Sequence, residues 1–221
     1  MKKWGLVVTL LYAVIVLGLL APVFLLLAAN PTPDLAKFKE LYQQWGLWII
    51  AGVFILIQFT LLSLSVDTSQ KRMRSRTPIV ISAVTTGFLL MIVTAVVAFA
   101  STVVVTGEAG FPDLGGRGLI FAIIGGLWIV WGVLFYLLYR NATDPVTHAL
   151  SWLFRGSVLE LLVAVPSHVI VRRRHDCCAP GVTAFGITSG IAIMLLSFGP
   201  SVLLLFKKRM EKYSVRGTEN K

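Results

Sequence analysis

Six apolar runs constrain this chain more than any other feature, because each is long enough to cross a lipid bilayer. An α-helix needs about 20 apolar residues to cross about 30 Å of hydrocarbon. The runs cover residues 5–29, 46–66, 78–105, 118–139, 149–171 and 182–206. Since a backbone in lipid must satisfy its own hydrogen bonds, such runs are expected to be helices. The sequence therefore predicts an all-α, multi-pass membrane protein with one transmembrane domain over residues 1–221.

The composition agrees with a membrane location. Of the 221 residues, 57% are hydrophobic and 14% are charged, whereas a soluble domain carries about 25% charged residues. The net charge of +10 lies in short clusters between the apolar runs, which is how topology signals are distributed. We therefore expect no nucleic-acid partner. The expected partners are the lipid bilayer and either other membrane protein subunits or further copies of this chain.

The basic clusters favour an orientation with both termini inside. Cytoplasmic loops carry the excess of Lys and Arg, and six spans place residues 2–3, 71–76 and the basic tail 207–221 on one side. The tail is then cytoplasmic, in what we expect to be a bacterial or archaeal cytoplasmic membrane. The first run exceeds the about 7–15 residues of a signal-peptide core, so we interpret it as an anchor.

A short helix is predicted between the first two spans. Pro31 and Pro33 open this connection, and apolar or aromatic side chains then recur at helical spacing. These side chains are Leu35, Phe38, Leu41 and Tyr42. The pattern indicates an amphipathic helix that lies on the membrane surface.

The fifth run carries Arg155 and Glu160 deep within an apolar segment. A charge at the bilayer centre costs at least about 2.5–3.5 kcal/mol, so such groups are expected to face protein or water. At 100° per residue, Glu160 shares one stripe of the helix with Ser157, Ser167 and His168. Two interpretations stay open for this stripe: a proton or ion relay, or a polar contact that fixes helix packing.

Arg155 lies about 140° around the helix from Glu160, which is a poor geometry for an ion pair within the helix. We expect Arg155 to face another helix or to extend its guanidinium toward the inner interface. Pro166 removes one backbone hydrogen bond, and a kink there would open the outer end of this helix.

The segment that follows the fifth run combines three arginines with two adjacent cysteines. Arg172, Arg173 and Arg174 are candidates for binding lipid headgroups or an anionic solute, or for anchoring the helix end. His175, Asp176, Cys177 and Cys178 are candidates for thiol chemistry or for binding a soft metal ion. The alternative is a tight turn whose cysteines pack as small apolar residues, with no cofactor.

Gly186 and Gly190, four residues apart in the sixth run, permit close contact with a neighbouring helix. The sequence contains no phosphate-binding glycine loop, zinc-binding His pair or serine-nucleophile motif, so no catalytic residue is predicted. Three functions remain: a small transporter with its polar site at Glu160 and His168, a non-catalytic membrane subunit, or a thiol-redox or soft-metal protein.

Overall fold

The computed structural model describes residues 2–28, 35–67, 76–106, 117–140, 142, 145–174 and 179–198. Within these residues the secondary structure is helical, and six helices are long and apolar enough to cross a membrane, as the sequence predicts. The elements are α1 (Lys2–Ile15), η1 (Val16–Leu20), α2 (Ala21–Ala28), α3 (Leu35–Gln43), α4 (Trp45–Asp67), α5 (Arg76–Thr106), α6 (Arg117–Tyr139) and α7 (Pro145–Arg174). A further helix spans Ala179–Phe198, and we call it the 179–198 helix.

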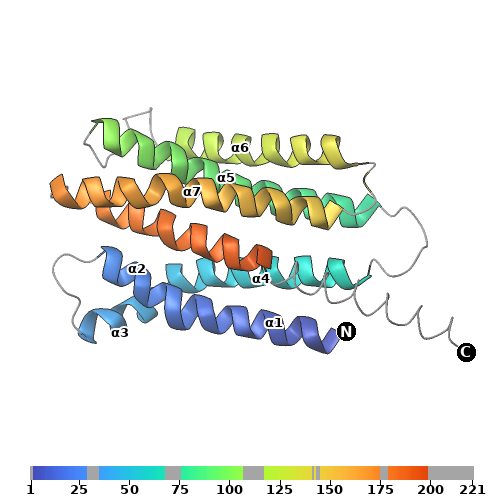
Figure 1. The fold of residues 1–221 in the computed structure, drawn as a ribbon, viewed down its shortest axis with the longest axis horizontal. Helices are drawn as coiled ribbons and strands as arrows, with labels where there is room; N and C mark the ends of the chain where they lie inside the picture. Colours follow the sequence, from blue (N-terminus) through green and yellow to red (C-terminus); the bar gives the residue numbers. More distant parts are fainter. Residues whose placement is uncertain are drawn as a thin grey trace, which may run out of the picture.

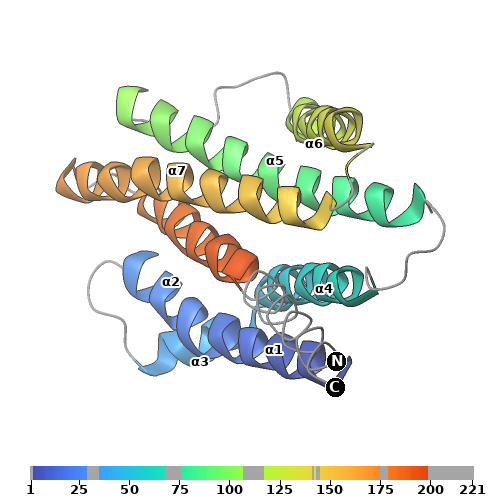
Figure 2. The ribbon, with the colours of Figure 1, turned by 45° about the vertical axis from the view of Figure 1, so that its right-hand side comes forward.

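The helices form two groups with the 179–198 helix between them. Figures 1 and 2 show α1, α2, α3 and α4 on one side of this helix and α5, α6 and α7 on the other. Successive long helices run in opposite directions, so the 179–198 helix runs back toward the end at which α1 begins (Figure 1). One core cluster joins the two groups, with Tyr12 from α1, Phe54 from α4, Leu89 from α5, Leu153 from α7 and Ile193 from the 179–198 helix.

The first span is a continuous helix with a π-helical turn, η1, in its middle. In this turn the amide of Ala21 donates to the carbonyl of Val16, five residues earlier. The next amide in that pattern would belong to Pro22, which has no N–H, so the carbonyl of Leu17 lacks a donor within the helix. The hydroxyl of Tyr42, on α3, donates to this carbonyl. A π-turn often accompanies a functional site, and this one lies beside the cavity described below.

The helix α3 lies where the sequence predicts a short helix between the first two spans. Leu41 is buried, whereas the neighbouring Lys37, Lys39 and Glu40 are exposed. Leu41 lines the cavity described below, and the Tyr42 hydroxyl ties α3 to the first span. Whether α3 lies on a membrane surface stays a prediction.

The fifth span is longer than predicted. The sequence indicates residues 149–171, but α7 begins at Pro145 and continues without a break through Pro166 to Arg174. Proline suits the first helical turn because its missing N–H would have no partner there. The predicted end of the sixth span, residues 199–206, lies outside the described residues, as does the basic tail.

Candidate functional site

The site is built where α7 packs against the 179–198 helix. The two helices are antiparallel, because residues later in α7 meet residues earlier in the partner: Glu160 meets Ser189, and His168 meets Thr183. Gly186 and Gly190 lie in this contact. A Cβ on Gly186 would be 2.5 Å from Cγ1 of Val96 and 3.3 Å from Cβ of Ala164. Glycine at this position therefore brings the backbone of the 179–198 helix close to α5 and α7 together.

Glu160 is a carboxyl group with no exposed surface. Its Oε1 lies 2.7 Å from the hydroxyl of Ser189, and its Oε2 has no hydrogen-bond partner within the described residues. The described ranges also show no ion pair between Glu160 and a Lys or Arg side chain. Within the described residues the carboxyl therefore has one neutral hydroxyl as its hydrogen-bond partner. An acidic group without a cation is costly in an apolar interior.

The hydroxyl of Ser189 has more acceptors than it can serve. Its oxygen lies 2.7 Å from Oε1 of Glu160 and 2.8 Å from the carbonyl of Phe185, yet a serine hydroxyl carries one hydrogen. Ser189 donates to Glu160 when the carboxylate is ionised. When Oε1 carries a proton, Glu160 donates to Ser189, and Ser189 donates to Phe185. The direction of this short chain thus depends on whether Glu160 holds a proton.

His168 forms a second polar contact between the same two helices. Its Nδ1 lies 2.8 Å from the hydroxyl oxygen of Thr183, which is also 3.1 Å from the carbonyl of Ala179. Nε2 of His168 is buried without a hydrogen-bond partner in the described part of the chain. If the Thr183 hydrogen goes to the carbonyl, Nδ1 carries the imidazole proton and Nε2 is a free acceptor. His168 follows Glu160 by eight positions, which correspond to about 12 Å along α7.

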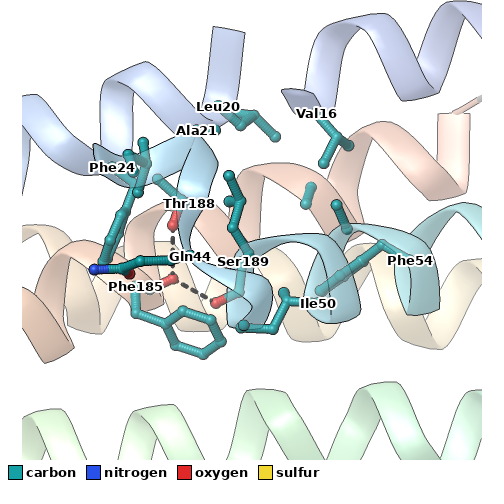
Figure 3. Close-up of a pocket in the computed structure, with 15 residues that line it drawn as sticks. Val16, Leu20, Ala21, Phe24, Gln44, Ile50, Phe54, Phe185, Thr188 and Ser189 are labelled. Atoms are coloured by element: carbon teal, nitrogen blue, oxygen red, sulfur yellow. Dashed lines mark hydrogen bonds between the residues drawn. The ribbon is translucent and has the colours of Figure 1, made fainter. Parts of the chain in front are cut away.

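A cavity of about 270 Å³ lies on the other side of Ser189. This open cavity is lined by the end of the first span, α3, the start of α4 and the 179–198 helix, as Figure 3 shows. Its walls are mostly apolar, and its polar side chains are Gln44, Thr188 and Ser189. Ser189 therefore separates the buried carboxyl of Glu160 from this cavity.

The other residues of the predicted stripe share the buried face of α7. Ser157 is fully buried and donates to the carbonyl of Phe154, and Ser167 donates to that of Val163. Both hydroxyls are thus satisfied within their own helix. Of the four polar residues on this face, the hydrogen bonds place Glu160 and His168 against the 179–198 helix.

Arg155 lies on the opposite side of α7 from Glu160. It is exposed on the outer surface of the bundle, among exposed apolar residues such as Leu159 and Leu162. No ion pair to Arg155 is present among the described residues.

Of the three arginines at the end of α7, Arg173 is exposed, Arg172 is partly buried, and Arg174 donates to the carbonyl of Val104 at 2.9 Å. Arg174 thus ties the end of α7 to α5.

The predicted thiol or metal site lies outside the described residues, since it consists of His175, Asp176, Cys177 and Cys178. In the ranges that are described, no group of three or more His, Cys, Asp or Glu side chains is arranged to hold a metal ion.

Sequence reasoning missed Thr183 and Ser189, the two hydroxyls that meet the buried polar groups of α7. A signal for Thr183 is present, because Thr183, Gly186 and Gly190 follow one another at helical spacing along one face. It also missed Gln58, a buried amide on α4 with 1% of its surface exposed.

Comparison of the chain with protein-family models, with curated proteins and with solved structures finds no match.

Proposed function

We propose that this chain is a proton-coupled carrier of small solutes across the membrane, with Glu160 as its proton site. The observation that carries the proposal is the position of Ser189, whose single hydroxyl contacts the buried carboxyl of Glu160 and also lines the cavity. A solute that binds against Ser189 changes the hydrogen bonding of Glu160. A proton on Glu160 in turn changes the direction of the Ser189 hydroxyl hydrogen and so the hydrogen bonding of Ser189 to the solute.

The hydrogen bonding of Glu160 supports a proton site over a packing contact. A carboxyl that serves helix packing is expected to meet a cation or several donors, because an unpaired polar atom in an apolar interior is costly. Glu160 meets one hydroxyl at Oε1, and Oε2 meets no described donor. Intramembrane acids of this kind are typical of proton relays in transporters. His168, farther along the same face of α7, is the candidate for the next step of the relay.

The arrangement of helices also supports a carrier. A carrier exposes its site to the two sides in turn, often by the movement of one group of helices against another. Here α4 makes only limited direct contact with α5 and α7, and the 179–198 helix contributes Ala192, Ile193 and Leu196 to the core cluster that joins the two groups. The cavity lies on the face of that helix toward the first group, and Glu160 lies on its face toward the second.

Arg155 favours a second candidate function, that of a membrane subunit in a larger assembly. A guanidinium on the apolar outer face of α7 is costly in lipid unless it reaches the interface or meets an acidic partner. A neighbouring subunit with an acidic side chain at the same depth would provide that partner.

The third function, thiol-redox or soft-metal chemistry at Cys177 and Cys178, stays a prediction. The orientation with both termini inside also stays a prediction.

The proton site is tested by infrared spectroscopy of the protein in lipid nanodiscs, with the pH of the buffer varied. The carboxylic-acid C=O band of Glu160 is expected in acidic buffer and is expected to disappear reversibly as the pH rises. Glu160→Gln should lack this band at every pH. Glu40→Gln is the matched control, because Glu40 is an exposed glutamate on α3, and this variant should retain the band. Identical spectra for the wild type and Glu160→Gln would contradict the proposal.

A further inference from the structure

We infer that the cavity beside Ser189 binds a small amphiphilic ammonium ion, with an apolar body and an N–H donor at its head. This inference rests on the proposed function, because it names the class of solute that the proton site would accompany.

The walls of the cavity favour an apolar body. Twelve of its fifteen lining residues are apolar or glycine. Its large apolar side chains include Phe24, Phe54, Phe185, Leu20 and Ile50. Burial of methylene groups against such walls favours binding. The volume of about 270 Å³ lies just below the range of about 300–1,000 Å³ typical of small-molecule sites, so the body is small.

The polar part of the wall favours a head group that donates hydrogen bonds. The Thr188 hydroxyl lies 3.0 Å from the carbonyls of both Ala184 and Phe185, so its hydrogen is used within the helix. The Ser189 hydrogen goes to Phe185 or to Glu160. Each hydroxyl oxygen keeps a lone pair, and both residues line the cavity, so these two groups are acceptors for a ligand donor (Figure 3). The amide of Gln44, on the exposed side, offers a donor and an acceptor.

The charges near the cavity favour a cation over an anion. No charged side chain is among the residues that line it. The carboxyl of Glu160 is connected to the wall by a described hydrogen bond, through Ser189. An ammonium ion against Ser189 would stabilise the ionised form of that carboxyl, whereas a carboxylate ligand would be repelled by it. An alcohol of the same shape supplies the donor without the charge and is expected to bind more weakly.

The test measures saturable binding of radiolabelled hexylamine to the full chain in nanodiscs, with empty nanodiscs subtracted to remove partition into lipid. Saturable binding is expected. Unlabelled hexanol should compete weakly, and hexanoate should not compete. An equal signal from empty and protein-loaded nanodiscs would overturn the inference, and so would hexanoate competing as well as hexylamine.

Two pairs of variants locate the binding site. Ser189→Ala should weaken hexylamine binding by at least about tenfold, because it removes a hydroxyl that would accept a hydrogen bond from a charged donor. Ser197→Ala, on the same helix but outside the cavity wall, should bind as the wild type does. Gly46→Phe should abolish binding, because Gly46 lines the cavity and has open space at its Cβ position. Gly52→Phe has equally open space but lies outside the lining, so it should retain binding.

Wild-type affinity in either Ser189→Ala or Gly46→Phe would place the amine elsewhere and overturn the inference. Failure here is distinguishable from failure of the proposed function. A pH-dependent Glu160 band without hexylamine binding would keep the proton site and reject the solute class. Hexylamine binding without that band would keep the cavity site and reject Glu160 as the proton site.

Discussion

At the residue scale, Pro22 determines the local structure of the first span. It withholds the amide that the carbonyl of Leu17 would meet in the π-helical turn, and the hydroxyl of Tyr42 donates to that carbonyl instead. A residue on α3 thus completes the hydrogen bonding of the first span. Val16, Leu20 and Ala21 of this turn line the cavity, so the same interaction fixes one wall of the proposed solute site.

Tyr42→Phe should lower the free energy of unfolding by about 1–3 kcal/mol, because it leaves the carbonyl of Leu17 without a donor in an apolar setting. Pro22→Ala supplies an amide to this turn, so the Tyr42→Phe cost should be smaller in that background. Thermal unfolding of the wild type, both single variants and the double variant measures the coupling. If the changes in the free energy of unfolding of the two single variants simply add in the double variant, Pro22 is not the reason that the carbonyl of Leu17 requires the Tyr42 hydroxyl.

Residues differ in how readily the sequence reveals them. Glu160 can be recognised as a candidate site residue from the sequence, because a carboxyl within a long apolar run is costly unless it faces protein or water. Ser189 is not evident, because a serine in a membrane helix commonly bonds its own backbone, and the sequence alone does not show which serine meets Glu160. Ser157 and Ser167 share the predicted stripe, yet both bond carbonyls of α7.

At the element scale, Gly186 sets the distance between the 179–198 helix and its neighbours. The sequence indicates a close helix contact at Gly186 and Gly190 but does not identify the neighbouring helix, because the motif encodes one surface only. Similarly, Gly87 of α5 meets the backbone of α6, where a Cβ would lie 2.7 Å from the amide nitrogen of Gly132.

Gly186→Ala should destabilise the protein by about 1–3 kcal/mol, because the new methyl group would overlap Val96 and crowd Ala164. Gly181→Ala is the matched control on the same helix. Nothing lies within 4 Å of its added Cβ, and alanine favours a helix by up to about 1 kcal/mol over glycine. Denaturant unfolding in mixed micelles would compare them. Equal stabilities of the two variants would show that the close approach is absent.

At the scale of the whole molecule, the hydropathy pattern predicts the six helices of the described chain that are long and apolar enough to cross a membrane, because each must satisfy its backbone alone in lipid. It does not predict that the sixth helix lies between the other two groups, since packing between apolar helices depends on side-chain shape. That placement sets the cavity on one face of the 179–198 helix and Glu160 on the other.

In the proposed carrier, solute binding in the cavity and protonation of Glu160 are coupled through Ser189. The pH dependence of hexylammonium affinity measures this coupling. A cation favours the ionised carboxyl, so binding should release the Glu160 proton at any pH where the free protein holds it and the complex does not. Over that interval affinity should rise with pH by up to about tenfold per unit, and it should level off once Glu160 is ionised in the free protein. Glu160→Gln should show no such rise below the pH at which the amine itself deprotonates. A flat wild-type profile, or the same rise in Glu160→Gln, would contradict the account.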